Sequence, residues 1–600
     1  MHKWSGLDGL AKWSGGLLIM LMFLASHPAR ADWINLGGAE VAPNIAEIHV
    51  EDDGVRILLE VFVGDLDVFS DLVPADWMAE AGRQVPPDVE RLAQFAADGL
   101  KISTGTGTVL SMEREVAERR LRVDRASPLA GQIDPYSGRR MPRAPEDPRV
   151  LYAELFYRFE GARPNSLTIS PPQDENGAVA ATIGAVFFHH AVPVIDFRFL
   201  SAPATLELDW DDPWYSRFDN PNLRRHHRYP RMTYLYAEPY EIRHEALVRV
   251  RDAMERTAMT AETGQLDNAQ ARELAEAMAR EIGANTPMTI EGRPVTADFD
   301  RFAFMRIGMR GLEFLQPGEA VDVDADILGL IWSVPTDGLP QEATLEWAWF
   351  DDKVPDVAGY AVDAAGPFLF PLTADDRRVT WTNHFKVDPY PAITAIKLET
   401  PDGTTPLVLS LGGAALFGLG IAGIGFLRRR NGGRTLILVG GTVAVVALVV
   451  LPLAQSRQAN RLPEMDREKL TALTTDLLNN VYRAFDFRTE DQVYDRLALT
   501  LEGAVLEQTY LDQREALRIE RAGGADARVE ALETVAVERL ESESAGELRL
   551  KAEWIVRGSV GHWGHIHRRT NDYEAEISIA PVEGSWKIRD FDILSQERLQ

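Results

Sequence analysis

The clearest pattern of hydrophobic and polar positions lies towards the C-terminal end of the chain. Apolar side chains alternate with polar ones over residues 548–560, and the alternation returns over residues 573–579. A period of two over that length predicts long strands with one buried face. Upstream, apolar residues recur at helical spacing over 470–485 and 493–505. We therefore expect residues 463–600 to form an α+β domain, with helices first and an antiparallel sheet after them.

The N-terminal part of the chain shows shorter strand patterns separated by turn residues. Residues 48–63 have the pattern of two strands around Asp53-Gly54, which is a hairpin signal. Similar patterns fill residues 32–238, and they return in residues 239–398 after a helix that Asp267 is placed to cap. They predict two β-rich ectodomains built as sandwiches, the second of them immunoglobulin-like.

Two longer apolar runs separate these regions from the C-terminal domain. Residues 407–427 and 435–454 contain no charged residue. Each is long enough to span a bilayer, which needs about 20 apolar residues. The loop between them, residues 428–434, carries four arginines. Positive loops stay in the cytoplasm, so the pattern predicts a two-helix transmembrane hairpin with both flanking parts outside.

The N-terminus has the features of a signal peptide. Lys3 and Lys12 precede a short apolar run over residues 15–25, and Ala29-Arg30-Ala31 supplies a small-x-small cleavage pattern. We expect residues 1–31 to be removed and the mature chain to begin at Asp32. The prediction that follows is a protein of the inner (cytoplasmic) membrane, whose folded domains face the periplasm or exterior.

Composition narrows the classes of function. The formal net charge of −28 argues against nucleic-acid binding, because the phosphates would repel the chain. The chain has no cysteine, which excludes disulfides, iron–sulfur clusters and thiolate zinc sites. The catalytic motifs G-x-S-x-G, H-E-x-x-H and G-x-x-x-x-G-K are also absent. These absences favour a protein that is not an enzyme.

One local cluster is a candidate metal site. Three of the twelve histidines, His562, His565 and His567, lie within six residues. Neutral imidazoles at this spacing are suited to Zn²⁺ or Cu²⁺, with water or a carboxylate, nearest that of Asp590 or Asp592, as the fourth ligand. The alternative is that these histidines are hydrogen-bonded or stacked groups at a hairpin tip.

Strand parity suggests where these side chains point. His565 and His567 share odd numbering with Arg569, Asn571 and the apolar positions of the following strand. Residues two apart lie on one face of a strand, so all four are expected on the inner face. Arg569 and Asn571 are therefore expected to line a pocket, together with Asp590 and Asp592.

The C-terminal domain also carries a resemblance. Helices followed by long strands that end in Y-x-A-x-I-x-I and W-K-I-x-D-F, at residues 573–579 and 586–591, resemble the NTF2-like superfamily. The resemblance covers residues 463–600 and implies a cone-shaped fold around one concave pocket. Members of that superfamily include enzymes, scaffolds and association modules. The resemblance therefore implies a pocket but does not indicate any particular reaction.

Together these features predict a membrane-tethered extracytoplasmic binding or scaffold protein of a bacterial cell envelope, with envelope proteins as partners. Two alternatives stay open. One is an extracytoplasmic metal-handling protein that uses the C-terminal histidines, and the other is a pocket enzyme in the NTF2-like domain.

Overall fold

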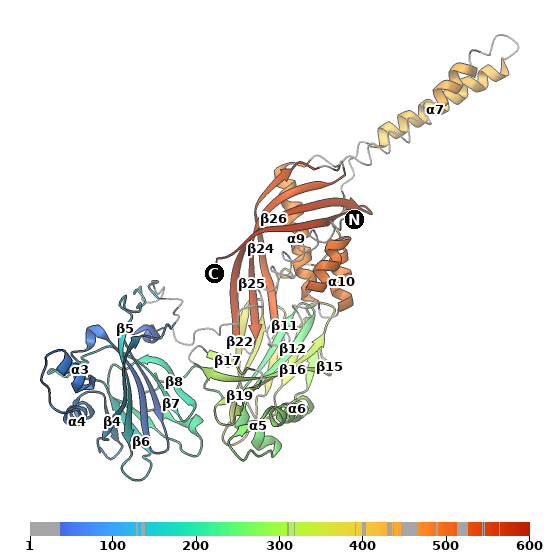
Figure 1. The fold of residues 1–600 in the computed structure, drawn as a ribbon. Coiled ribbons are helices and arrows are strands. Elements are labelled where there is room, and N and C mark those ends of the chain that lie inside the picture. Colours follow the sequence, from blue (N-terminus) through green and yellow to red (C-terminus); the bar gives the residue numbers. More distant parts are fainter. Residues whose placement is uncertain are drawn as a thin grey trace, which may run out of the picture. The chain divides into compact units, whose positions relative to one another are not determined.

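The computed structural model divides the chain into two compact units, one centred on residues 30–384 and the other on residues 385–600 (Figure 1). The structure describes residues 37–599 except 126, 128–129, 134–137, 309–310, 317, 391, 399–403, 429–434, 436, 446–461, 463–464, 488–489, 513–525, 543, 545 and 563–564. The side chains of 311, 404–415, 526–528 and 560–569 also lie outside this description. So does the predicted signal peptide, residues 1–31.

The N-terminal β-region, residues 37–229, consists of two sheets that enclose one core. The larger sheet has the order β4 (Met112–Leu121), β5 (Arg149–Arg158), β2 (Gly54–Phe62), β1 (Asn44–Val50), β7 (Ile183–His189), β8 (Val192–Phe199). The smaller sheet has the order β10 (Arg217–Phe218), β9 (Ala204–Glu207), β6 (Ser166–Ser170), β3 (Lys101–Thr104). Helical segments are η1 (Ala39–Val41), η2 (Val63–Asp65), η3 (Ser70–Leu72), α3 (Ala75–Glu80), α4 (Asp88–Asp98) and η4 (Pro213–Tyr215).

The hairpin expected around Asp53-Gly54 is confirmed, because β1 and β2 pair antiparallel with Val50 opposite Val55. Their inward side chains, among them Ile48 and Ile57, are fully buried in the core. Gly184 on β7 allows a close approach of η1, since a Cβ there would lie 1.8 Å from the Ala39 carbonyl oxygen. The β-rich prediction therefore holds for this region.

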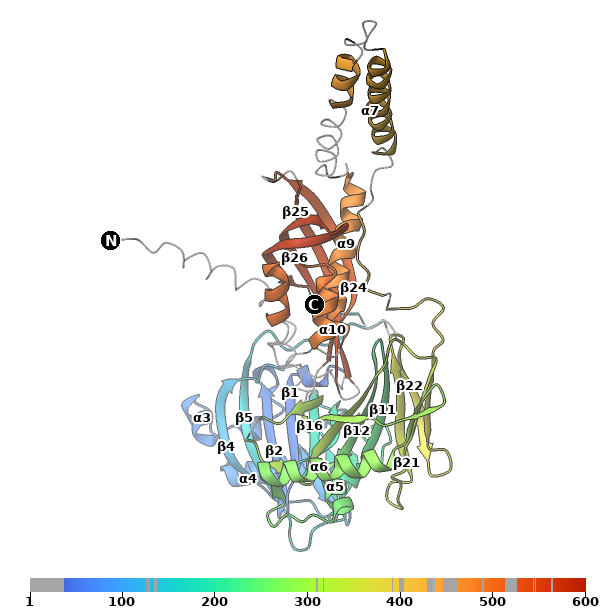
Figure 2. The same cartoon turned by 90° about the vertical axis from the view of Figure 1, so that its right-hand side faces the viewer.

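The central β-region, residues 230–384, is built on a seven-stranded sheet. Its order is β17 (Gly311–Phe314), β16 (Asp298–Gly308), β19 (Asp326–Pro335), β12 (Glu241–Arg249), β11 (Arg231–Glu238), β21 (Asp356–Asp363), β22 (Gly366–Thr373). A four-stranded sheet has the order β15 (Arg293–Val295), β14 (Met288–Ile290), β20 (Glu342–Glu346), β23 (Arg378–Thr382), and β13 (Gln265–Leu266) pairs with β18 (Val321–Asp322). Helices α5 (Val250–Thr257) and α6 (Asn268–Asn285) lie across the strands β12, β16 and β19 (Figure 2).

Two expectations about this region are wrong. An immunoglobulin-like sandwich is antiparallel, whereas β11 pairs parallel with β21 in the seven-stranded sheet. The predicted boundary at residue 238 also falls inside a hairpin, because β11 pairs antiparallel with β12. The chain passes from the sheets of the N-terminal β-region to the seven-stranded sheet just before Arg231. The sequence there shows a basic run and no clear break in the strand pattern.

The C-terminal unit contains α7 (Thr404–Leu427) and a helix over residues 437–445, followed by α9 (Arg467–Arg483), η6 (Ala484–Asp486), α10 (Glu490–Ala498) and a helix over residues 504–512. Its sheet has the order β24 (Asp526–Leu540), β25 (Leu548–His562), β26 (His565–Val582), β27 (Ser585–Arg598). Trp554, Tyr573 and Ile577 are buried, as the alternation predicts. The predicted order of helices and strands is thus confirmed. Residues 396–398, expected to end the second ectodomain, instead hydrogen-bond to the backbone at Gly584 and Trp586.

The predicted transmembrane hairpin is contradicted. Among the helices that the structure describes with their side chains, none is long and apolar enough to cross a membrane. Much of the second predicted span, residues 435–454, and most of the loop over 428–434 lie outside the described residues. The prediction that two helices anchor the chain in a membrane is therefore wrong for the described residues.

Candidate functional site

The three histidines predicted as metal ligands flank the tip of one hairpin. Strand β25 ends at His562 and β26 begins at His565, while the side chains of His562, His565, His567 and Arg569 lie outside the described residues. Among the residues whose side chains the structure describes, no group of three or more His, Asp or Glu residues could hold a metal ion. The metal site at this tip stays a prediction.

The two carboxylates proposed to join them lie elsewhere on the sheet. Asp592 pairs with Glu576 and Asp590 with Ser578, so both sit on the outer face of the sheet. A β-bulge between Ser578 and Ile579 shifts the parity of β27, so the sequence alone does not show which face these two carboxylates occupy. Glu576 is also nine residues from His567 along β26, which corresponds to about 30 Å.

Asn571 follows the predicted parity. It is buried on the inner face, and its Nδ2 donates to the Tyr573 hydroxyl at 3.2 Å. Trp554, on the neighbouring strand, stacks on Tyr573 at 5.5 Å and donates to the Tyr482 hydroxyl at 3.3 Å. These hydrogen bonds and this ring contact link the buried polar groups of Asn571, Tyr573, Trp554 and Tyr482 to one another. We therefore assign these side chains a structural role.

A larger candidate site lies in the central β-region, which the sequence did not single out. A cavity of about 560 Å³ lies between α6, the β14–β15 hairpin and the sheet strands β16, β19 and β12. It is lined by His244, Glu276, Ala279, Arg280, Gly283, Ala284, Thr286, Pro287, Met288, Val295, Thr296, Ala297, Phe299 and Trp332. Ligand pockets commonly have about 300–1,000 Å³ and a mostly apolar lining with a few polar groups.

His244 forms part of the cavity floor and is held rigidly. Its Nε2 shares a hydrogen bond of 3.0 Å with the Thr233 hydroxyl, and its ring stacks on Trp332 at 4.8 Å with an interplanar angle of 15°. The ring of Trp347 packs edge-on at 6.4 Å. Burial lowers the pKa of His244 to about 3, so the ring is neutral at pH 7. With Nε2 engaged by Thr233, Nδ1 is the ring nitrogen left for a ligand.

Helix α6 forms the opposite wall. Asp267 accepts hydrogen bonds from the backbone of Ala269 and Gln270, and Gln270 closes a capping box on Asp267. Gly283, in the last turn, lies against Trp332, because a Cβ there would be 3.2 Å from the indole Nε1. The absence of a side chain at Gly283 lets the helix approach while the edge of the indole faces it.

The rim of the cavity carries two opposite charges and one exposed aromatic ring. Glu276 and Arg280 are both exposed on α6, four residues apart. Neither forms an ion pair with any residue whose side chain is described. Phe299 is 40% exposed, and its ring lies 5.7 Å from that of Trp332. The cavity therefore combines an aromatic wall with a free carboxylate and a free guanidinium.

A second cavity, of about 240 Å³, lies in the N-terminal β-region beside β8 and β9. Its lining includes Phe187, Phe218 and Arg198. It is smaller than most ligand pockets, so the cavity beside α6 is the stronger candidate.

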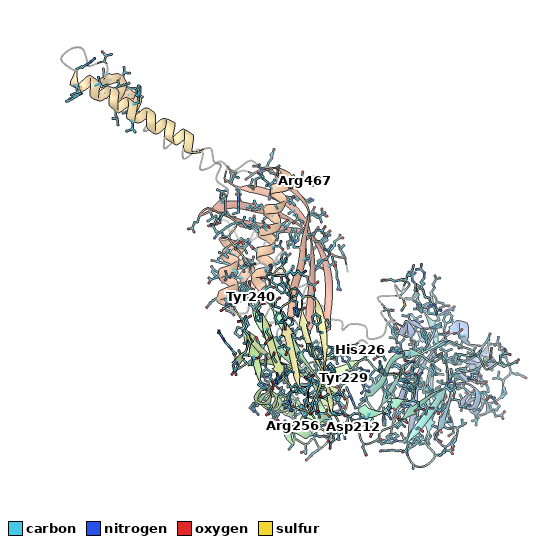
Figure 3. All side chains as sticks on the ribbon, turned by 180° about the vertical axis from the view of Figure 1, so that it is seen from behind. Asp212, His226, Tyr229, Tyr240, Arg256 and Arg467 are labelled. Atoms are coloured by element: carbon cyan, nitrogen blue, oxygen red, sulfur yellow. The ribbon has the colours of Figure 1, made fainter. Side chains whose placement is uncertain are left out.

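A cluster of buried charges elsewhere in the same unit consists of arginines and aspartates that pair with one another. Arg249 binds both carboxylate oxygens of Asp212 at 2.8 and 3.1 Å, and Asp252 lies 3.4 Å away (Asp212 is labelled in Figure 3). Arg231 lies 3.4 Å from Asp252 and 2.6 Å from Asp351. Because each cation has carboxylate partners, removing one member would leave an uncompensated buried charge, and we assign the cluster a role in the fold.

The cavity went unnoticed in the sequence because its lining comes from separate segments. His244 lies on β12 between Arg243 and Glu245, and His244-Glu245 lacks a second histidine four residues on, so no motif marks it. Trp332 and Phe299 belong to other strands, which only the sheet order brings together. The available signal was an alternation over residues 242–248, in which His244 shares even numbering with the apolar Ile242, Ala246 and Val248.

Comparisons with known proteins add little to this geometry. No protein-family model matches the chain, and the search of curated proteins gives no match. Among solved structures, the chain is similar to the crystal structure of the intermembrane-space region of the chloroplast protein ARC6. That match has 17% sequence identity and a TM-score of 0.18, and it covers 22% of this chain and 99% of that chain. A TM-score this low carries no argument, and the NTF2-like resemblance stays a prediction.

Proposed function

We propose that this chain is an extracytoplasmic binding protein that holds a small ligand in the cavity between α6 and the strands β16, β19 and β12. The observation that carries the proposal is the cavity of about 560 Å³, whose aromatic lining includes a few polar groups. Export outside the cytoplasm is supported by the signal-like pattern of residues 1–31.

Binding suits this site better than catalysis. A general acid or base works best when its pKa lies near the working pH, whereas burial lowers the pKa of His244 to about 3. His244 is also fixed between Thr233 and Trp332, a geometry that orients a hydrogen-bonding group. A rigid aromatic floor with one free ring nitrogen is well suited to positioning a ligand.

A cavity-filling variant tests this function. Ala284 is exposed and lines the cavity, so Ala284→Trp should fill its mouth without entering the core. Glu273→Trp places the same side chain on an exposed position of α6 outside the cavity lining and serves as the matched control. The full chain is screened by thermal shift against a library of small molecules.

The proposal predicts compounds that raise the melting temperature of wild type and of Glu273→Trp but leave Ala284→Trp unchanged. If every stabilising compound acts equally on all three proteins, the cavity is not the binding site and the proposal is wrong.

A further inference from the structure

We infer that the ligand of this cavity is a small zwitterion with an apolar or aromatic side chain, the chemistry of a free aromatic α-amino acid. The inference rests on the proposed function, and it names the ligand class from the charges and rings of the cavity rim.

The two rim charges are of opposite sign and close together. Residues four apart on a helix have Cβ atoms about 5–6 Å apart, so Glu276 and Arg280 can reach one ligand at the same time. An α-amino acid carries its ammonium and carboxylate on one carbon, which matches a neighbouring carboxylate and guanidinium. Arg280 provides a planar fork for the ligand carboxylate, and Glu276 accepts from the ammonium.

The two charges are available for this role. A Glu followed by a basic residue four positions later often forms an ion pair along the helix. Here the side chains of Glu276 and Arg280 stay separate, and no other described side chain pairs with either. A zwitterion would satisfy both charges at once, whereas a simple anion or cation would satisfy one.

The end of α6 disfavours an anionic ligand without an ammonium. The last turn contains no basic residue, and Gly283, Ala284 and Thr286 at this end line the cavity. The unpaired carbonyl groups of a helix C-terminus carry partial negative charge. A ligand with a net negative charge would be repelled by the helix C-terminus and by Glu276, and Arg280 alone would attract it.

The apolar side of the cavity supplies a surface for the ligand side chain. Phe299 exposes its ring at the rim, and Trp332 presents its indole edge below it. Aromatic rings prefer offset or edge-to-face contacts at about 4.5–7 Å, so an aromatic side chain can pack against these two. The Trp332 Nε1–H and the His244 Nδ1 then lie at the base of the cavity.

The test is isothermal titration of the full chain with three matched ligands. L-Phenylalanine carries both charges, L-phenylalaninamide lacks the carboxylate, and N-acetyl-L-phenylalanine lacks the ammonium. The inference predicts that L-phenylalanine binds about 10- to 100-fold more tightly than either analogue, the range expected for one charged hydrogen-bonded pair.

Two variants assign each charge to its partner. In Arg280→Gln, L-phenylalanine and its amide should bind equally, because the carboxylate has lost its partner. In Glu276→Gln, L-phenylalanine and the N-acetyl compound should bind equally. Arg272→Gln and Glu273→Gln, exposed on the same helix outside the cavity lining, are the matched controls and should behave as wild type.

Three results overturn the inference: no binding of L-phenylalanine, equal binding of all three ligands by wild type, or unchanged preferences in both charge variants. Library compounds that stabilise wild type but not Ala284→Trp would keep the cavity as the binding site. If L-phenylalanine does not bind in that case, only the inferred ligand class is wrong. If Ala284→Trp changes no binding at all, the proposed function fails as well.

Discussion

At the scale of single residues, burial determines which charges this protein can carry. His244 is 2% exposed and is neutral at pH 7, because no nearby charge offsets its loss of water. Arg249 is 1% exposed and stays paired with carboxylates on both sides. One buried group avoids charge and the other requires a partner, so they respond differently to pH and to substitution.

The neutral His244 should make stability depend on pH. Its pKa is about 3 in the folded chain, against the ordinary histidine value of 6.5 once the chain unfolds, so the unfolded state binds more protons between these limits. Stability from this residue is therefore complete above about pH 6.5 and falls as the pH drops towards 3. Between pH 7.0 and 4.5 we expect a loss of about 2–3 kcal/mol from this group.

Urea unfolding of wild type and His244→Phe at both pH values checks this prediction. The variant removes the titrating ring, so the stability difference between the two proteins should shift in favour of the variant at pH 4.5. The other histidines titrate equally in both proteins and cancel. An identical pH dependence in the two proteins would show that His244 is protonated without penalty.

Two ion pairs in the same unit offer a contrast in burial. The pair of Arg249 and Asp212 is buried, whereas the pair of Arg217 and Glu207, at 3.0 Å, has side chains 77% and 51% exposed. Asp212→Ala leaves Arg249 with less compensation and should cost about 3–5 kcal/mol of unfolding free energy. Glu207→Ala should cost less than about 1 kcal/mol. Equal losses in chemical denaturation would contradict the structural role given to the buried network.

At the scale of elements, α6 shows how a local signal positions a site. Asp267 is the N-cap that the sequence predicts, and the capping box fixes where the helix begins. The same helix presents Glu276, Arg280 and Gly283 to the cavity. Removing the cap should therefore loosen the wall that holds the rim charges.

Asp267→Ala should lower the unfolding free energy by about 1 kcal/mol, the usual value of an N-cap. Asp267→Asn, which keeps a side-chain oxygen as acceptor, should retain most of it. Thermal unfolding of the full chain measures both. Equal destabilisation by the two substitutions would mean that the carboxylate charge, and not the cap, matters there.

Local patterns of this kind were predictable, and long-range pairings were not. The alternation through Trp554 and Tyr573 correctly identified the buried faces of β25 and β26. It could not place Asp590 and Asp592, because one bulged residue reverses the face and leaves no mark in the pattern. The parallel partner of β11 is more than one hundred residues away, and pairing at such distance has no local signal.

At the scale of the whole molecule, the chain combines a β-rich unit and an α+β unit. The apolar runs predicted a membrane hairpin, whereas none of the helices described with their side chains is long and apolar enough to span a membrane. The lining of the cavity comes from strands and a helix spread over residues 244–332. No stretch of sequence short enough to be a motif could have contained it.

One expectation concerns the N-terminus of the mature chain. If residues 1–31 direct export, the mature chain purified from its native host should begin at Asp32, which intact mass and N-terminal sequencing would show. A mature chain that retains residues 1–31 would contradict export by cleavage.

The C-terminal unit should fold by itself. Its helices and sheet form a single pattern of ordinary domain size, so residues 463–600 should be soluble and unfold in one cooperative transition. Extending the fragment to include residues 385–398 should raise its melting temperature, because this segment hydrogen-bonds to Gly584, Trp586 and Asn480. A broad transition for both fragments would show that the unit depends on the rest of the chain.

The central claim is that the cavity beside α6 binds a ligand, and ¹⁹F NMR of the chain labelled with 5-fluorotryptophan tests it most directly. The chain has thirteen tryptophans, and Trp332→Phe identifies the resonance of the one that lines the cavity. Titration with a compound that stabilises wild type but not Ala284→Trp should move the Trp332 resonance, with Trp347 as the next affected ring. A Trp332 resonance that stays fixed while other tryptophans move would place the ligand elsewhere and contradict the account.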